Sequence, residues 1–154
     1  MGTPIHDLTI ESLVAYSPKD AAAIGKLLSH LSESFSGDPV SEQTLTDIIE
    51  SPYHEQLVAR DGSESIVGTA TVSVTFGAGV GCNAWLEDFV VNPEMQRMGI
   101  GSRLWDAIID WCHEKNVQKL GFTSRASRTT AQAFYLKRGA VIRDTNYFKK
   151  DIQD

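Results

Sequence analysis

An apolar strand pattern, a glycine-rich turn and a helix pattern follow one another in residues 86–111, and this order constrains the fold more than any other feature. The stretch reads LEDFVVNPEMQRMGIGSRLWDAIIDW, with Gly99 and Gly101 directly before the helix pattern. The first N–H groups of a helix have no partners within the helix, and the helix dipole adds positive charge there. Glycines also let an oxyanion approach the backbone closely. The stretch therefore predicts a phosphate-binding turn, with Arg97 as an additional cation.

Two common nucleotide-binding turns do not match this stretch. A Walker A loop requires GxxxxGK[ST], which is absent. A Rossmann fingerprint requires GxGxxG near the start of a βαβ unit. Here Gly99-Ile100-Gly101 is followed by Ser102-Arg103-Leu104, so the third glycine is missing. These two kinds of nucleotide-binding domain are therefore disfavoured.

The rest of the chain predicts an α/β fold of the mixed-sheet, α+β kind. Residues 8–16, 54–61, 65–77, 84–91 and 119–125 have strand patterns, and 17–35, 41–52, 102–115 and 129–139 have helix patterns. Residues 140–144 and 146–152 resemble a closing pair of strands. The order predicts a mixed, mostly antiparallel sheet of about six to seven strands with helices on both faces.

Composition narrows the class of partner. The 154 residues suggest one domain with a sizeable core. A formal net charge of −6 argues against nucleic acid and is compatible with a cationic substrate. No apolar run is long enough to span a bilayer, and the N-terminus lacks the order of a signal peptide, so we expect a cytoplasmic protein. The two cysteines form no CxxC pair and the histidines lack ligand spacing, so no metal is expected.

Two motifs together resemble those of a known family. The pattern [Gln/Arg]-x-x-Gly-x-[Gly/Ala] is matched by residues 96–101, and with the preceding LEDFVVNPE it resembles the acetyl-CoA pyrophosphate loop of the GNAT N-acetyltransferase superfamily. The stretch TTAQAFYLKRGA is similar to the family's second signature, an Ala-x-x-(Phe)-Tyr helix that ends in glycine. The element order agrees over almost the whole chain. The resemblance implies a single GNAT N-acetyltransferase domain over residues 1–154, with acetyl-CoA as co-substrate.

The resemblance also implies which residues hold acetyl-CoA. The strand after the long helix would splay away from its neighbour to admit the cofactor, and Arg128 stands where the family often has an Asn that contacts it. Arg128 can reach a CoA phosphate, or it can be a solvated charge. The backbone of Phe89, Val90 and Val91 would pair with the pantetheine arm, and Gln96, Arg97, Met98, Gly99, Ile100, Gly101 and Ser102 would surround the pyrophosphate.

Residues 86–140 are most similar to the spermidine/spermine N-acetyltransferase branch, through LEDFVV, GIGS and FYLKRGA. In that branch the glutamate of LEDF is the base, which is Glu87 here, and the next residue, Asp88, contacts the amine. A carboxylate can take the proton of a cationic amine directly or through water. Tyr135 occupies the place of the family's tyrosine near the thioester sulfur. A phenol with a pKa of about 10 can protonate the departing thiolate.

The same residues also have purely structural interpretations. Glu87 and Asp88 are neighbours in a strand, so they point to opposite faces unless the strand bulges. Tyr135 can be an ordinary tyrosine of an amphipathic helix. Trp85 can line an acceptor pocket, but a packing role is favoured.

Two functions fit the sequence. The first is transfer of an acetyl group from acetyl-CoA to a primary amine by direct attack in a ternary complex, and the second is a catalytically silent acyl-CoA sensor of the same fold. Glu87 and Tyr135 favour the enzyme. The LEDF resemblance and the charge favour a small cationic amine. Polyamine, aminoglycoside-like amine, peptide N-terminus and lysine stay open as acceptors, and homodimers are common in the family.

Overall fold

Segments with strand patterns form one five-stranded sheet in the computed structural model, which describes residues 7–153. The strands are β1 (Thr9–Ser12), β2 (His54–Arg60), β3 (Ile66–Gly77), β4 (Gly81–Val91) and β5 (Leu120–Gly121), in that spatial order. Neighbours from β1 to β4 are antiparallel, and β5 joins β4 in parallel. The predicted mixed, mostly antiparallel sheet is confirmed, with five strands rather than six or seven. The expectation about a signal peptide falls partly on residues 1–6, which lie outside the described residues.

Local sequence signals explain where the helices begin and end. The helices are α1 (Pro18–Leu28), α2 (Glu42–Glu50), α3 (Ile100–Glu114) and α4 (Thr129–Lys137), with a short 3₁₀ turn, η1 (Pro93–Met95). The Ser17 side chain accepts a hydrogen bond from the Asp20 N–H, and Ser41 accepts one from the Thr44 N–H. Both serines are therefore N-caps, a role in which serine is strongly preferred.

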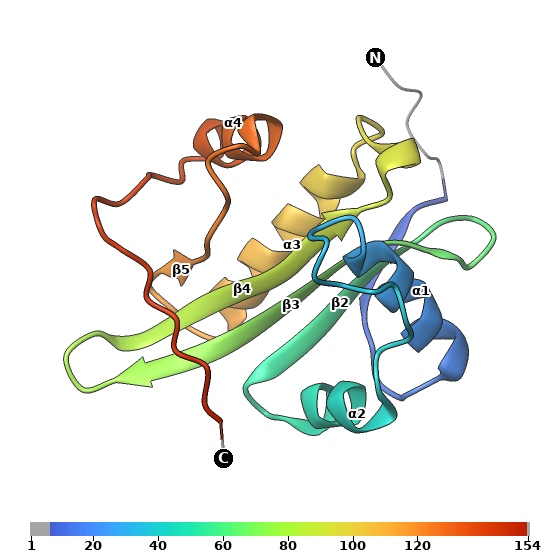
Figure 1. The fold of residues 1–154 in the computed structure, drawn as a ribbon, viewed down its shortest axis with the longest axis horizontal. Coiled ribbons are helices and arrows are strands. Elements are labelled where there is room, and N and C mark those ends of the chain that lie inside the picture. Colours follow the sequence, from blue (N-terminus) through green and yellow to red (C-terminus); the bar gives the residue numbers. More distant parts are fainter. Residues whose placement is uncertain (1–6, 154) are drawn as a thin grey trace. The chain divides into compact units, whose positions relative to one another are not determined.

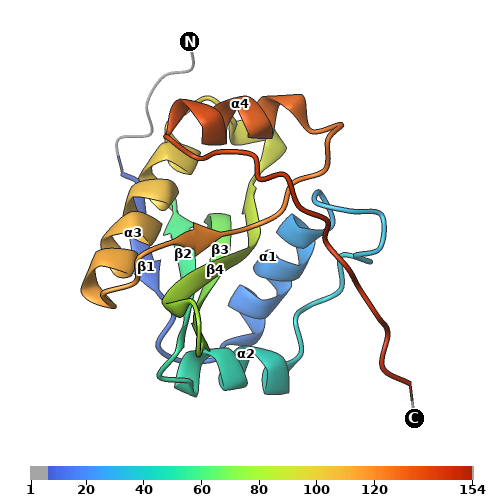
Figure 2. The same ribbon diagram turned by 90° about the vertical axis from the view of Figure 1, so that its left-hand side faces the viewer.

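The helices of the first part of the chain cover both faces of the sheet. Figures 1 and 2 show α3 on one face and α1 and α2 on the other. On α3, Leu104, Ile108 and Trp111 are all buried and form one core-facing stripe. This arrangement leaves the β4–η1–α3 connection at the rim of the sheet, where β4 ends.

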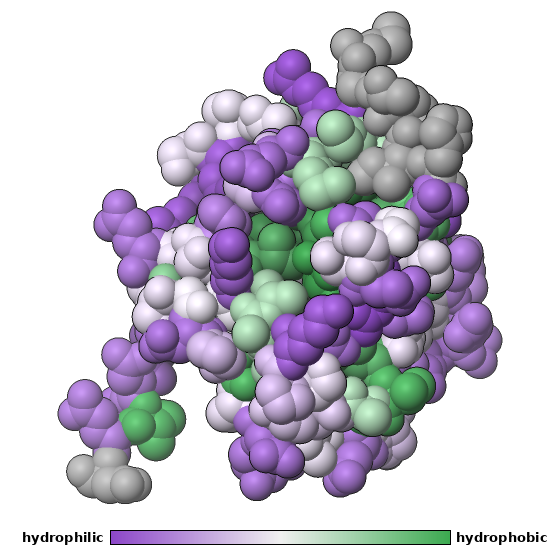
Figure 3. Space-filling view, turned by 90° about the vertical axis from the view of Figure 1, so that its right-hand side faces the viewer, coloured by the Kyte–Doolittle hydropathy of each residue, from purple (hydrophilic) through white to green (hydrophobic). Residues whose placement is uncertain are grey.

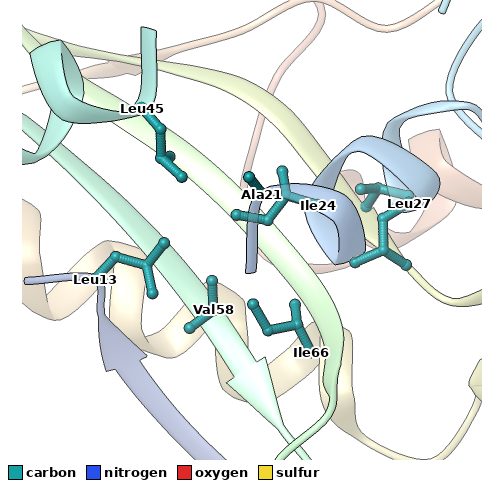
Figure 4. Packing of buried hydrophobic residues seen from close by; sticks show 8 residues of the cluster. Leu13, Ala21, Ile24, Leu27, Leu45, Val58 and Ile66 are labelled. Atoms are coloured by element: carbon teal, nitrogen blue, oxygen red, sulfur yellow. The ribbon is translucent and has the colours of Figure 1, made fainter. Parts of the chain in front are cut away.

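Apolar side chains from successive elements fill the space between α1, α2 and the sheet. Figure 4 shows this cluster, in which the labelled side chains are Leu13, Ala21, Ile24, Leu27, Leu45, Val58 and Ile66. Burial of such side chains is the main favourable contribution to folding. Outside the core, the face drawn in Figure 3 is mostly hydrophilic, with separate hydrophobic areas between the polar side chains.

The chain divides into two compact units, Met1–Phe122 and Thr123–Asp154, which are described separately. The first holds the sheet and α1 to α3, and the second holds α4 and an extended segment. The closing strands predicted at 140–144 and 146–152 do not form in the second unit. Alternation of apolar residues indicates which side chains favour burial, but a strand also needs a partner strand whose backbone it can pair with. Large apolar side chains of this segment are accordingly exposed, from 72% at Tyr147 to 87% at Phe148.

Candidate active site

The glycine-rich turn presents a helix N-terminus without a side-chain cap. Arg97 and Gly99 both have left-handed backbones, with φ of 67° and 83°. Gly99 is the N-cap of α3 and has no side chain to take the first helical N–H groups. Alternating backbone conformations of this kind turn successive N–H groups toward one point, which favours an anion. The turn has the local geometry that the sequence predicts for a phosphate.

Packing against the sheet fixes the position of this helix end. Ile100 and Leu104 are buried, and a Cβ on Gly68 of β3 would lie 2.9 Å from Leu104 Cδ1 and 3.2 Å from Ile100 Cγ2. Gly68 therefore lets the first turn of α3 approach the sheet closely. Arg103 Nη1 also donates to the Leu8 carbonyl oxygen at 2.6 Å, which ties α3 to the start of β1. The sequence analysis missed Gly68, although a glycine inside a strand pattern is a signal of close approach.

A β-bulge places the two acids of LEDF. Thr71 of β3 pairs with Glu87 and Thr69 pairs with Val90, so Asp88 and Phe89 together stand opposite one residue of β3. Asp88 has a left-handed backbone, with φ of 53°. A bulge of this kind leaves the extra residue out of the ladder and turns the strand locally. The simple alternation that would send Glu87 and Asp88 to opposite faces therefore does not apply here.

The two carboxyl groups have different surroundings. Glu87 is exposed, and its Oε1 accepts a hydrogen bond from Trp85 Nε1 at 2.7 Å. Asp88 is only partly exposed, and burial raises the pKa of its carboxyl. The negative charge of Glu87 adds to that rise in the Asp88 pKa. The bulge therefore carries one anchored, solvent-facing carboxylate and one carboxyl that holds its proton more tightly than usual.

The ladder between β4 and β5 stops before the predicted cofactor-binding segment of β4. β5 pairs only with Ala84 and Trp85, so within residues 7–153 no strand continues the ladder beside Phe89, Val90 and Val91. Backbone N–H and C=O groups along such an edge can pair with an extended, amide-containing ligand. The Phe89 ring lies 6.4 Å from the Trp105 ring, centroid to centroid, so it packs toward α3. This open edge leads directly into η1 and the glycine turn.

A buried polar network supports β3 beside the bulge. Gln56 of β2 is 3% exposed, and its Nε2 donates to Thr69 Oγ1 at 2.7 Å. The Thr71 hydroxyl donates to Gln56 Oε1 at 2.7 Å, and Thr71 is the residue paired with Glu87. Satisfied networks of this kind fix the strands that carry them. The sequence analysis missed Gln56, whose only signal is an amide within an apolar strand pattern.

The second unit carries the remaining candidates, Tyr135 and Arg128. Both belong to α4 and its N-cap, and Gly139 ends this helix with φ of 87°. The Ala140 N–H donates to the Tyr135 carbonyl oxygen at 3.1 Å, which completes a Schellman-type end. Burial raises the pKa of the Tyr135 phenol, and the positive charge of Arg128 opposes that rise. Tyr135 is therefore a phenol that keeps its proton at neutral pH.

The structure thus gathers most of the predicted site residues within the first unit. The residues that lie along β4, the turn that follows it and the start of α3 are Trp85, Glu87, Asp88 and the segments 89–91 and 96–102.

Of the helices described, none is long and apolar enough to cross a membrane. Across residues 7–153 there is also no group of three or more His, Cys, Asp or Glu residues placed to hold a metal ion.

Comparison with known proteins gives consistent matches. The model of the acetyltransferase (GNAT) family matches residues 24–140. A putative [ribosomal protein bS18]-alanine N-acetyltransferase of Bacillus subtilis is 23% identical over 107 residues, which are 69% of this chain and 66%, just under two thirds, of that protein.

Solved structures share the fold at low sequence identity. An aminoglycoside acetyltransferase from an uncultured soil metagenomic sample, in complex with sisomicin, superposes with a TM-score of 0.81 at 20% identity, covering 95% of this chain and 97% of the other. An acetyltransferase of Trypanosoma brucei has a TM-score of 0.74 at 23% identity, covering 95% and 100%.

Proposed function

Because the chain belongs to the acetyltransferase (GNAT) family, we propose that it moves an acetyl group from acetyl-CoA to a primary amine by direct attack in a ternary complex. The observation that carries this proposal is the bulge of β4. It brings Glu87 and Asp88 onto the stretch of β4 that lies beyond the pairing with β5 and leads into the glycine turn. A base for the amine and a binding surface for the acetyl donor are thus built on one continuous segment.

The residues of that segment fit acetyl-CoA. The edge of Phe89 to Val91 offers backbone partners to the two amides of the pantetheine arm. The turn at Arg97 and Gly99 offers N–H groups and a guanidinium to the pyrophosphate. The remaining residues proposed around the pyrophosphate are Gln96, Met98, Ile100, Gly101 and Ser102, and Arg128 of the second unit is proposed to reach a CoA phosphate. When bound, acetyl-CoA supplies the thioester that the amine attacks.

The protein's part in the reaction is to move protons. Glu87 takes a proton from the ammonium form of the acceptor, directly or through one water, so that the nitrogen lone pair can attack. The new C–N bond forms as the C–S bond breaks, and Tyr135 gives its phenolic proton to the departing sulfur. The nitrogen then loses its second proton through water, and a proton from water restores the Tyr135 phenol. The raised pKa of Tyr135 keeps it in the protonated form that this role requires. Backbone N–H groups at the bulge are proposed to stabilise the carbonyl oxygen as it gains charge.

We propose a small cationic amine as the acceptor. The net charge of −6 attracts cations, and Asp88 beside Glu87 adds an acidic group to the site. The similarity of LEDFVV to the spermidine/spermine branch supports the same class. Among proteins of similar sequence or fold, one is named for a ribosomal-protein alanine and another for aminoglycosides. These acceptors, together with lysine, are the competitors to be tested.

A panel of amines tests the function and the acceptor class together. Purified protein and acetyl-CoA are incubated with spermidine, sisomicin, a lysine-bearing peptide and an alanine N-terminal peptide, and released CoA is measured with a thiol reagent. We expect release that depends on the amine and is highest with spermidine. Tight binding of acetyl-CoA in calorimetry, without release for any amine, would instead favour the acyl-CoA sensor.

The assembly and location belong to the same proposal. We propose a single domain over residues 1–154 that acts in the cytoplasm as a homodimer. The exposed apolar side chains of the second unit, which include Val141, Ile142, Tyr147, Phe148 and Ile152, support self-association because apolar surface of this kind favours burial against a partner. Light scattering after size exclusion should give twice the chain mass. A monomeric mass at micromolar concentration would remove the dimer from the proposal.

A further inference from the structure

We propose that Trp85 is a positioning residue that holds the Glu87 carboxylate, and that Gly121 of β5 is the residue that makes room for its ring. The inference rests on the proposed function only for the role of Glu87 as base. It assigns Trp85 a role other than contact with the acceptor. It also explains why the edge strand beside the site carries a glycine.

The hydrogen bond between the two side chains has the geometry of a strong one. Trp85 and Glu87 are two residues apart in β4, so they project from the same face of the strand. Trp85 Nε1 lies 2.7 Å from Glu87 Oε1. The indole N–H can only donate, and a carboxylate acceptor makes the bond stronger than a neutral pair. Glu87 is otherwise an exposed side chain with several accessible rotamers, so this bond selects one of them.

The indole ring is held in turn by the backbone of β5. Trp85 pairs with Gly121 in the parallel ladder. A Cβ on Gly121 would lie 2.8 Å from both Cε3 and Cζ3 of the Trp85 ring, closer than side-chain atoms tolerate. Every residue other than glycine at this position would therefore push the ring away. Gly121 thus lets the ring lie against β5 with its N–H directed at Glu87.

The position of this pair in the sheet connects it to the reaction. Trp85 and Gly121 form the last pairing of β4 with β5 before the open edge that we assign to acetyl-CoA. The contact therefore fixes the base at the point where the two strands part. A catalytic group held in one orientation avoids the reorganisation that a free side chain would need in the transition state. Trp85 acts on the reaction through Glu87 and not through the substrate.

Nuclear magnetic resonance tests the contact independently of activity. The chain has three tryptophans, so Trp85→Phe assigns one of three indole signals in a ¹H–¹⁵N spectrum. We expect Glu87→Gln to move that signal, because the charged acceptor is lost, and Gly121→Ala to move it as well. Gly79→Ala is the matched control, because a Cβ there meets no atom within 4 Å. An indole signal of Trp85 that stays in place in Glu87→Gln would overturn the proposal.

Kinetics with the best acceptor tests the consequence. Trp85→Phe keeps a ring but removes the donor, and we expect kcat to fall about tenfold with an unchanged KM for acetyl-CoA. Glu87→Gln should lower kcat by a smaller factor in the Trp85→Phe background than in the wild type, because both changes disturb the same hydrogen-bonded pair. If the two substitutions lower kcat independently, so that their effects on the activation free energy add in the double variant, the positioning role is contradicted. If no amine is acetylated by the wild type, the proposed function fails, and the indole signal still decides whether Trp85 holds Glu87.

Discussion

At the scale of single residues, Gly99 sets the shape of the proposed pyrophosphate site. Its φ of 83° is one that other residues adopt at a cost of about 1–2 kcal/mol. Gly99→Asp adds this strain and places a negative charge against the pyrophosphate. We expect acetyl-CoA affinity to fall by at least about 100-fold in calorimetry, since like charges this close are strongly repelled. Gly79→Asp, which adds the same charge in the β3–β4 turn, should leave the affinity unchanged, and an equal loss there would contradict a local effect.

Tyr135 allows a test of the proposed acid. Tyr135→Phe should leave acetyl-CoA binding unchanged and lower kcat by about 100-fold, because a general acid contributes a factor of this order. Burial raises the pKa of the Tyr135 phenol above its usual value of 10.0. Since the protonated form is the active one, the alkaline fall of kcat that belongs to Tyr135 should lie above pH 10. Tyr53→Phe, a change at an exposed tyrosine of the first unit, is the control. Unchanged turnover in Tyr135→Phe would remove the acid role.

At the scale of elements, the ends of helices are predicted well, because capping residues act within a few residues of the helix end. Ser17, Ser41 and Gly139 mark helix ends correctly because caps and left-handed glycines act within one turn of chain. The strand expected at 119–125 contains only Leu120 and Gly121, and those expected after residue 139 are absent from the described chain. Strands depend on a partner backbone far away in sequence, which alternation does not reveal. The same reason applies to the bulge at Asp88. From the sequence, a bulge could be named only as the exception to regular alternation of side chains.

An ion pair between elements gives a test of the fold. Arg60 at the end of β2 donates to both carboxylate oxygens of Asp20 in α1, at 3.0 and 2.8 Å, and also pairs with Glu11 of β1. Both side chains of the Arg60–Asp20 pair are only 13% exposed. Asp20→Asn should lower the free energy of unfolding by about 2 kcal/mol near pH 7, less than for a fully buried pair, because Glu11 still neutralises Arg60. Urea unfolding measures this change.

The pH dependence of that loss has a definite sign. The hydrogen bond from Arg60 lowers the pKa of Asp20 below the reference value of 3.8. A lowered folded-state pKa gives stability that is present above the unfolded pKa and is lost as pH falls through the folded one. The difference between wild type and Asp20→Asn should therefore shrink below about pH 4. Asp151→Asn breaks an exposed pair with Lys149 and should change nothing measurable. A gap for Asp20→Asn that stays constant down to pH 2 would contradict the linkage.

At the scale of the whole molecule, the sequence predicts which residues form the candidate site, and the fold supplies their arrangement. Motif spacing predicts roles for the turn at Gly99 and for the acids of LEDF, because these residues are close in sequence. It does not identify Gly121 as the partner of the Trp85 ring, since that contact joins β4 to a strand that follows only after α3 in the sequence. The sequence does place Trp85 and Glu87 on one face of a predicted strand, and it shows Gly121 as a glycine within another predicted strand. Only the register of the sheet combines them.

The proposed reaction requires groups from both units of the chain. Glu87 and the glycine turn belong to the first unit, and Arg128 and Tyr135 belong to the second. If the residues of each unit bind acetyl-CoA as proposed, its binding should slow backbone amide exchange in residues 97–102 and also in α4. Hydrogen–deuterium exchange with and without acetyl-CoA measures this, because binding suppresses local opening of the segments that it contacts. Gly99→Asp with acetyl-CoA is the control and should show no protection. Protection limited to the first unit would remove Tyr135 and Arg128 from the site while leaving the role of the glycine turn intact.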